Sequence, residues 1–386
     1  MFSKEKAYHH LASLAYPRGV GSPGEERARK YINRLLELYG ITVKNQDFCF
    51  SKIIDYLTRI LPFLAGLCLW GITVLFPFQS WIPVCLLGSI IIILSILSFL
   101  PIQIGRLHKI NAKIKSSNII GFIPSLSEPK RHIVFIAHYD SKSQTLPIAI
   151  RTFCISLLIL SLLLIMFSHL FSYFFPIYPF FHVNRLSGFL SLLSGLLLFT
   201  NFTRNLSPGV ADNASGVSIV LELARIFSKN PLGNTQITLL FTCAEEYGMA
   251  GAFFYVENNP VSKLNTSFIN IDGVGDSSPI GIVRARKSLF SSTGKRLFNE
   301  IVQTADLLFL PFVPLKTLIG IGFDHIPIAS RGFNVVTLCS YSIQMVLRIH
   351  SKRDLIDYVC VNSLDNIGRL CEKYAREWDS NKLQDL

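Results

Sequence analysis

Two long runs of uncharged residues constrain this chain more than any other feature. The first extends over Ile60–Gly105 and the second over Thr152–Asn184, and an arginine stands at both ends of each run. A helix that crosses a membrane needs about 20 consecutive apolar residues. The first run is too long for one crossing and long enough for two, so the sequence predicts a membrane protein.

Breaks within these runs divide them into separate spans. Pro77–Ser80 interrupts the first run, and an aromatic, proline-containing segment follows the first span of the second run. The four spans are predicted near Leu57–Phe76, Ile82–Ile102, Thr152–Leu170 and Leu186–Phe202. Because the spans come in pairs, we predict two transmembrane hairpins, at residues 53–105 and 145–204.

The rest of the chain alternates between helices and buried strands. Helices are predicted at Glu25–Tyr39, from apolar residues at helical spacing, and at Ser215–Ser228. Short apolar runs predict strands at Ile133–Ala137, Gln236–Thr242, Ser267–Ile271 and Asn334–Leu338. This alternation predicts an α/β domain whose mainly parallel, mixed sheet carries helices on both faces. The domain is discontinuous and comprises residues 1–52, 106–144 and 205–386.

The composition agrees with such a mixed architecture. Half of the residues are hydrophobic and only 16% are charged, which is too apolar for a soluble enzyme and too charged for a pure membrane bundle. The formal net charge is +12, but many of the cations flank the apolar runs, which favours a role as topology signals. The sequence has no zinc-finger spacing, aromatic RNA-binding signature or arginine-rich arm, so we expect no nucleic-acid partner.

Five short segments carry residues that suit metal ions. They are His138-Tyr-Asp140-Ser, Asp212-Asn-Ala-Ser-Gly216, Glu245-Glu246-Tyr-Gly, Asn270-Ile-Asp272-Gly and His350-Ser-Lys-Arg-Asp354. The first, third and fourth directly follow predicted apolar strands. Ligands of open parallel sheets gather where the strands end, so we expect these side chains to converge on one crevice.

The residue types in these segments fit a pair of zinc ions. Zinc binds histidine nitrogens and carboxylate oxygens, and two zincs about 3.5–4 Å apart need a carboxylate between them. The adjacent pair Glu245 and Glu246 offers one ligand and one unligated general base. Asp140, two residues after His138, is expected to orient that imidazole. Each residue taken alone has an ordinary structural explanation, and only their joint occurrence favours a metal centre.

Together these segments resemble the M28 family of zinc peptidases, which includes aminopeptidases and carboxypeptidases and is close to the glutaminyl cyclases. The resemblance extends to Leu11–Gly24, to the helix that follows it, and to Phe323-Asp-His-Ile-Pro327, and it covers nearly all of the chain outside the hairpins. It implies a zinc-peptidase/phosphorylase-like fold, two zinc ions, a peptide substrate and aminopeptidase activity.

The resemblance also implies a role for each site residue. The implied zinc ligands are one pair for each ion and one bridging carboxylate: His138 with Asp272, Glu246 with His350, and Asp212 between them. Glu245 would deprotonate a metal-bridging water and then protonate the leaving amine. Asp140 would support this catalysis, and Asp324 and His325 would belong to the substrate pocket.

Three positions depart from the family pattern. Ala211 stands where a polar or acidic residue often precedes the bridging aspartate, and Ala244 stands where glycine is common before the glutamate pair. Ile349 replaces an aromatic residue that can help hold the oxyanion, which leaves the oxyanion partner and the substrate class open. Two alternatives remain: a glutaminyl-cyclase-like acyltransferase with one zinc, and an inactive membrane receptor or scaffold on a peptidase fold.

The distribution of cations predicts the orientation in the membrane. The cations near the four crossings on the peptidase side are Lys52, Arg59, Arg106, Lys109, Lys113, Lys115, Lys142, Arg151 and Arg204. On the opposite side the two turns hold only Arg185. The positive-inside rule therefore places the peptidase domain and both termini in the cytoplasm.

Other features agree with this orientation. Eight cysteines without a CxxC pair suit a reducing compartment, and the polar segment Met1–Phe50 lacks the apolar core of a signal peptide. The longer turn on the far side is expected to present an interfacial aromatic belt. Its members are Phe171, Tyr173, Phe174, Phe175, Tyr178, Phe180 and Phe181.

Overall fold

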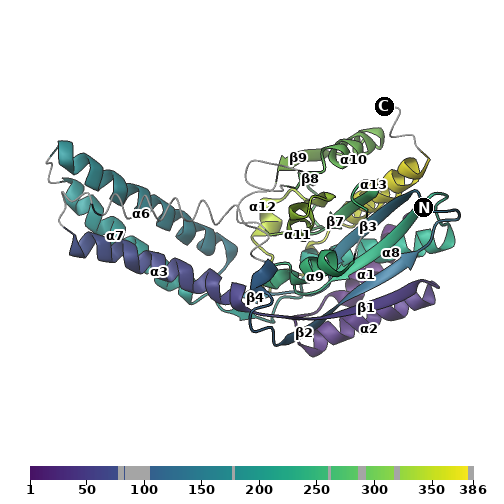
Figure 1. The fold of residues 1–386 in the computed structure, drawn as a ribbon, viewed down its shortest axis with the longest axis horizontal. Coiled ribbons are helices and arrows are strands. Elements are labelled where there is room, and N and C mark those ends of the chain that lie inside the picture. The colour runs from purple at the N-terminus through teal and green to yellow at the C-terminus, as the bar shows by residue number, and fades with distance from the viewer. Residues whose placement is uncertain are drawn as a thin grey trace. The chain divides into compact units, whose positions relative to one another are not determined.

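The computed structural model describes residues 1–76, 82, 105–175, 179–259, 262–285, 293–316 and 322–380 (Figure 1). The chain forms two compact units. The sheet unit contains Met1–Lys52, Pro101–Ser143 and Asn205–Leu386. The hairpin unit contains Ile53–Leu100 and Gln144–Arg204.

A mixed eight-stranded sheet forms the centre of the sheet unit, with the strand order β1-β2-β6-β3-β7-β10-β8-β9. The strands are β1 (Thr42–Phe50), β2 (Ile114–Ile123), β3 (Arg131–His138), β6 (Thr235–Thr242), β7 (Thr266–Ile271), β8 (Ile280–Arg284), β9 (Phe312–Lys316) and β10 (Asn334–Ser340). The central strands β6, β3, β7 and β10 are parallel, and β8 pairs with β9 in parallel. The other three pairings are antiparallel. The predicted mixed α/β sheet is confirmed.

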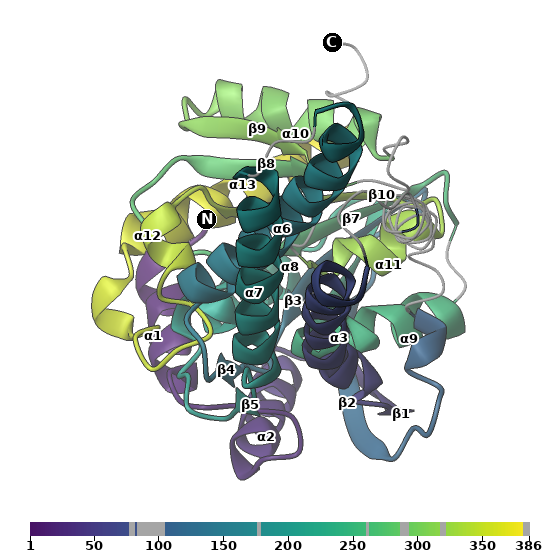
Figure 2. The ribbon, with the colours of Figure 1, turned by 90° about the vertical axis from the view of Figure 1, so that its left-hand side faces the viewer.

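Helices cover both faces of this sheet. They are α1 (Lys4–Leu14), α2 (Pro23–Leu38), α8 (Ser215–Lys229), α9 (Ala250–Asn258), α10 (Lys295–Leu307), α11 (His325–Ser330), α12 (Ile343–Val346) and α13 (Val361–Asp379), with the short helical turns η1 (Val210–Ala214), η2 (Glu245–Tyr247) and η3 (Ile356–Tyr358). Figure 2 shows α1 and α13 on one side of the sheet and α9 and α11 on the other.

The alternation of apolar side chains between the two faces of each strand explains why helices cover both faces of the sheet. On β3, Phe135 belongs to the core beneath α1, α8 and α13, whereas Val134 and Ile136 belong to the core beneath α11. Side chains alternate between the faces of a strand, so a run of consecutive apolar residues needs an apolar layer on each face. The predicted helices at 25–39 and 215–228 and the four predicted strands all appear, with ends displaced by one or two residues.

The Gly-Ser-Pro-Gly segment before α2 builds the start of that helix. The Ser22 hydroxyl accepts a hydrogen bond from the Glu25 N–H at 3.3 Å, and the Glu25 carboxylate accepts one from the Gly21 N–H at 2.6 Å. These bonds satisfy backbone N–H donors at the start of the helix that have no hydrogen-bond partner within the helix itself. Gly24 approaches the Pro17 carbonyl so closely that a Cβ there would lie 2.0 Å from the oxygen.

The hairpin unit is built from long apolar helices. They are α3 (Ile53–Leu75), α6 (Ile148–Phe174) and α7 (Pro179–Phe199), accompanied by the short paired strands β4 (Ser143–Gln144) and β5 (Thr203–Arg204). Among the described residues, three helices are long and apolar enough to cross a membrane. The predicted span at Ile82–Ile102 lies outside the described residues, except for Ile82.

Helix α6 extends beyond its predicted span at both ends, whereas α7 begins earlier than its predicted span and also ends earlier, at Phe199. The prediction of a long aromatic turn between the two helices is therefore wrong. Phe171, Tyr173 and Phe174 belong to α6, and Phe180 and Phe181 belong to α7. Aromatic residues tolerate helical geometry, and a proline in the first turn of a helix loses no intrahelical hydrogen bond. The segment that resembled a turn therefore continues α6 and starts α7 at Pro179.

Small residues bring α3 and α7 into close contact. A Cβ on Gly66 would lie 2.3 Å from the Ser191 carbonyl oxygen, and one on Gly195 would lie 2.8 Å from the Pro62 carbonyl oxygen. The Ser191 hydroxyl also donates to the Gly66 carbonyl at 3.3 Å. Close backbone packing at small residues is typical of helix pairs in membranes, where burial of apolar surface supplies little driving force.

Candidate metal centre

The predicted site residues converge where the central parallel strands end. His138 is the last residue of β3, Glu245 and Glu246 follow β6, and Asp272 follows β7. Strand β3 lies between β6 and β7, and all three are parallel. Their carboxyl ends therefore lie at the same edge of the sheet, as the sequence pattern predicts.

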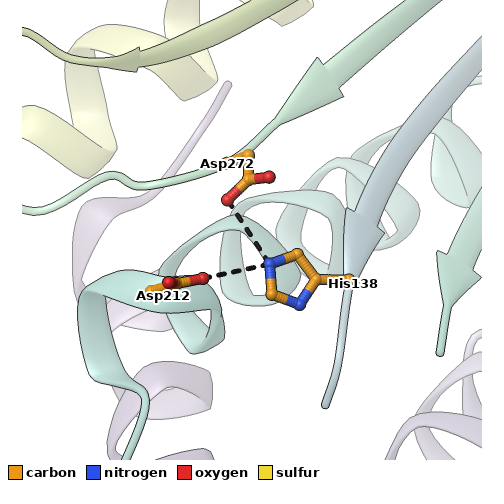
Figure 3. A group of neighbouring side chains, drawn as sticks. All are labelled: His138, Asp212 and Asp272. Atoms are coloured by element: carbon orange, nitrogen blue, oxygen red, sulfur yellow. Dashed lines mark ion pairs between the residues drawn. The ribbon is translucent and has the colours of Figure 1, made fainter. Parts of the chain in front are cut away.

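The first group of candidate ligands contains His138, Asp212 and Asp272, all of them buried. The His138 Nε2 atom lies 3.1 Å from Asp212 Oδ1 and 3.4 Å from Asp272 Oδ1. Figure 3 shows both carboxylates pointing at this one imidazole nitrogen. We call this group the inner half of the site.

The second group contains Asp212, Glu246 and His350. The His350 Nε2 atom lies 3.0 Å from Asp212 Oδ2 and 3.0 Å from Glu246 Oε2. Asp212 therefore offers one carboxylate oxygen to each group, which is the geometry that a bridging ligand requires. We call this second group the outer half, because the His350 side chain is 20% exposed whereas that of His138 is 0% exposed.

The turn that carries Asp212 is held against β7. The Asn213 side chain donates to the Ile271 carbonyl at 2.8 Å and accepts from the Gly216 N–H at 3.0 Å. A Cβ on Gly216 would lie 2.3 Å from the Ile271 carbonyl oxygen, so this position excludes larger residues. The Asp-Asn-Ala-Ser-Gly segment is thus explained by the need to place Asp212 beside the end of β7.

The donor set fits metal cations. The His138 Nε2 and Glu246 Oε1 atoms are buried and form no hydrogen bond with any described residue. Several carboxylates lie close together in a buried environment, which is costly unless cations compensate their charge. Imidazole nitrogens and carboxylate oxygens are the ligands that zinc binds. The residues that resemble zinc ligands are therefore suited to hold zinc.

Protons on the two imidazoles balance the charge when no metal is bound. Burial alone lowers the pKa of His350, but Glu246 and Asp212 outweigh it and raise this pKa to about 9. Burial likewise opposes protonation of His138, yet Asp272 and its neighbours hold the pKa of His138 well above the usual range. Although burial raises the pKa of Asp212, both histidines bring it below the usual range of an aspartate.

Asp140 supports both the imidazole and the glutamate pair. Its carboxylate accepts from the Glu245 and Glu246 N–H groups at 3.3 and 3.4 Å. The His138 Nδ1 atom lies 3.1 Å from the Asp140 carbonyl oxygen and 3.6 Å from its carboxylate. Such outer contacts can fix the orientation of metal ligands, and the orienting role of Asp140 stays a prediction.

Glu245 is half-buried and interacts electrostatically with candidate ligands of both halves. Burial, together with the charges of Asp272, Glu246 and Asp324, raises its pKa well above the usual range, although His138 opposes this shift. Before the glutamate pair, Ala244 has φ 60° and ψ 34°. This left-handed conformation strains alanine and suits glycine, which gives a physical reason for glycine being common at this position.

Two charged residues support the site although the sequence assigned them no role. The buried Asp354 accepts from the Ala211 N–H at 2.8 Å and from the Asp212 N–H at 3.2 Å, and burial raises its pKa to about 6. Arg18 is fully buried. Its guanidinium donates to five carbonyls: those of Leu14, Tyr16, Tyr139, Pro208 and Gly209.

Both residues lay inside motifs that the sequence analysis quoted. Asp354 ends the fifth segment and Arg18 belongs to the Leu11–Gly24 stretch. Arg18 connects the chain after α1, the residue after His138 and the turn that leads to Asp212. One feature of the sequence could have indicated that these two residues support the site. Each is a charged residue that lies inside a motif but has no ligand role of its own.

The predicted pocket residues Asp324 and His325 are both fully buried. The Thr242 hydroxyl donates to Asp324, and the His325 Nδ1 atom lies 2.6 Å from the Thr337 hydroxyl. Burial raises the pKa of Asp324 to about 7 and lowers that of His325 to about 3. Their assignment to the substrate pocket stays a prediction.

Known proteins resemble this chain in sequence. Aminopeptidase YwaD of Bacillus subtilis is 38% identical over 171 residues, which cover 42% of this chain and 36% of that protein. The putative endoplasmic reticulum metallopeptidase 1 of Schizosaccharomyces pombe is 25% identical over 175 residues, covering 42% of this chain and 19% of that protein. The chain thus matches about a third or less of the length of these curated relatives.

Solved structures share the fold. The aminopeptidase from Aneurinibacillus sp. strain AM-1 aligns with a TM-score of 0.58 at 14% identity, covering 97% of this chain and 94% of that one. The glutaminyl cyclase of Porphyromonas gingivalis aligns with a TM-score of 0.57 at 15% identity, covering 98% and 99%. At such identities the likeness shows the fold alone.

A family model supplies the decisive comparison. The model described as Peptidase family M28 matches residues 161–375, more than half of the chain. This match, the relatives in sequence and the shared fold agree with the residues gathered at the strand ends. The chain belongs to peptidase family M28, a family of zinc-dependent peptidases.

Proposed function

We propose that this chain is a membrane-bound aminopeptidase that uses two zinc ions. The observation that carries the proposal is the position of Asp212, whose two carboxylate oxygens face two different groups of candidate ligands. His138 and Asp272 would hold one ion, Glu246 and His350 the other, and Asp212 would bridge them. A bridging carboxylate is what a pair of zincs about 3.5–4 Å apart requires.

The zinc ions, when bound, would acidify the attacking water and polarise the scissile carbonyl. Glu245 accepts the proton of that water and then delivers it to the amine of the departing residue. The residue suits this role because it follows β6, adjoins Glu246, is half-buried and interacts electrostatically with His138 and Asp272. The Asp140 carboxylate accepts hydrogen bonds from the backbone N–H groups of Glu245 and Glu246. It therefore fixes the general base Glu245 and the ligand Glu246 relative to one another.

The hairpin unit supports the membrane part of the proposal. Three of its described helices have the length and apolar character of membrane spans. The sheet unit would then be a discontinuous peptidase domain, interrupted by two hairpin insertions. The cation distribution of the sequence supports a cytoplasmic position for this domain. A cysteine placed at Ser80 should react with an impermeant reagent in intact cells, and one at Ser380 should not; the reverse labelling would overturn this orientation.

A glutaminyl-cyclase-like reaction is the competing function, because a glutaminyl cyclase is among the proteins of similar fold. The site itself favours the peptidase, since its five candidate ligands form two groups and not one. The deciding experiment gives purified, zinc-loaded protein both aminoacyl peptides and peptides with amino-terminal glutamine. We expect hydrolysis of the aminoacyl peptides and loss of that activity in Glu245→Gln. Cyclisation of glutamine without hydrolysis would overturn the proposal.

A further inference from the structure

The two halves of the site contain the same donor chemistry. Each has one histidine and one carboxylate of its own, His138 with Asp272 and His350 with Glu246, and both share Asp212. On donor type alone the two zinc ions would bind with similar affinity. Any large difference between the halves must therefore come from the groups that surround these ligands.

One such group is Lys142, which contacts the outer half alone. Its ammonium donates to the Glu246 carbonyl at 2.6 Å and lies 3.3 Å from the Glu246 Oε2 atom. The Lys142 side chain is 12% exposed and that of Glu246 is 3% exposed, so little water screens the pair. The backbone hydrogen bond keeps this cation in place whether or not the carboxylate binds a metal.

Within the part of the chain that the structure describes, no comparable cation contacts the inner half. Among the described residues, the ion-pair partner of Asp272 within 4.0 Å is the imidazole of His138, and no lysine or arginine joins it. The buried cation Arg18 donates to backbone carbonyls, and its charge acts on Asp140 and on Asp212, the ligand that both halves share. Lys142 is thus a cation in direct contact with a ligand of the outer half, and among the described residues Asp272 of the inner half has no counterpart to it.

We propose that Lys142 weakens zinc binding to the outer half, so that the first zinc binds at His138 and Asp272 and the second binds later and less tightly at Glu246 and His350. The inference rests on the two-zinc site proposed above. Like charges a few ångströms apart in a poorly screened site repel each other strongly. We expect the two dissociation constants to differ by about 10–10³-fold for this reason. The occupancy of the outer half, and with it activity, would then follow the free zinc concentration.

Zinc titration of the full-length protein in detergent tests the proposal. The protein is stripped with a chelator, and the two affinities are measured by competition with a chromophoric chelator, independently of activity. Lys142→Met removes the charge and retains most of the side chain, and it should tighten the second zinc at least tenfold while leaving the first within about twofold. Lys142→Arg keeps the charge and should retain a weak second site.

A matched lysine controls for net charge. Lys109 pairs with Glu257 at 2.8 Å and contacts no candidate ligand, so Lys109→Met should change neither affinity. An unchanged or weaker second zinc in Lys142→Met, with circular dichroism showing the native fold, would overturn the inference. If Lys142→Met does not fold, Lys142→Gln serves as the neutral variant under the same criterion. A single zinc in the wild-type protein would instead refute the proposed two-zinc function itself.

Discussion

The inner and outer halves of the site use the same ligand chemistry on different supports. In the inner half, His138 ends β3 and Asp272 follows β7, two strands that pair directly in the sheet. In the outer half, Glu246 lies in η2 and His350 in a loop with a positive φ of 57°. The comparison teaches that strand ends place the ligands of one half, whereas a helical turn after β6 and a loop place those of the other.

Asp212 is common to both halves, and its removal should have the largest effect. In Asp212→Ala both proposed zinc sites lose a ligand, so we expect loss of both ions and of measurable hydrolysis. Asp272→Ala, by contrast, should impair the inner half selectively. Zinc content by mass spectrometry checks the distinction, and Asp47→Ala, an exposed aspartate on β1, serves as control. A variant of Asp212 that retains one tightly bound ion would show that the halves are not bridged.

In the proposed mechanism Glu245 acts on the bridging water without binding metal itself. Glu245→Gln should lower kcat by about 10²–10⁴-fold, because it removes proton transfer. Its zinc content should remain that of the wild-type protein, since no candidate ligand is lost. Near-normal turnover would remove Glu245 from the mechanism, and loss of zinc would identify it as a ligand.

The outer half should couple metal binding to pH. The raised pKa of His350, about 9, means that its imidazole is protonated at neutral pH when no metal is bound. Zinc must displace this proton, so its affinity should fall as the pH decreases from 9 and binding should release protons. Calorimetry in buffers of different ionisation enthalpy measures the release. Zinc binding at pH 7.5 without proton release would contradict the charge balance described for the metal-free site.

The raised pKa of His350 also predicts how the stability of the metal-free protein depends on pH. His350 has a folded-state pKa above its unfolded value of 6.5. It therefore contributes stability that is complete below pH 6.5 and is lost as the pH rises through about 9. The contribution is at most about 3 kcal/mol. Denaturant unfolding of chelated protein at pH 7 and pH 10 should show this loss, and a His350→Ala variant should show a smaller one.

The smallest expected effect is the change in stability on substituting Ala244, the residue in a left-handed turn before the glutamate pair. Ala244 has φ 60°, and glycine adopts this conformation without the clash that a Cβ causes. Ala244→Gly should therefore stabilise the fold by about 0.5–1 kcal/mol, after allowing for the greater freedom of glycine in the unfolded chain. Ala224→Gly within helix α8 is the matched control and should destabilise. Equal destabilisation by both changes would contradict the argument from strain.

Much of the inner half could be predicted from the sequence, because its residues directly follow apolar strands. The pattern places His138 and Asp272 at strand ends, and parallel strands bring those ends together. The supports of the shared ligand Asp212 and of the outer half could not be predicted in the same way. Nothing in a loop sequence shows that Asp354 becomes buried beneath the Asp212 backbone or that Lys142 reaches Glu246, because both contacts depend on how distant loops fold together.

In the hairpin unit the sequence predicts the helices but not where they end. The unit's three described long apolar helices could be predicted from composition, since long uncharged runs suit helices in lipid. Their ends could not, because Phe171, Tyr173 and Phe174 are compatible with both a helix and an interfacial turn. A proline such as Pro179 is likewise found in turns and in the first turn of helices.

Zinc stoichiometry measured together with hydrolysis tests the central claim most directly. Chelated full-length protein is titrated with zinc while bound metal per chain and cleavage of an aminoacyl substrate are followed in parallel. The account predicts that two ions bind per chain and that full activity requires the second. Full activity with a single bound zinc, or two bound ions without any hydrolysis, would contradict it.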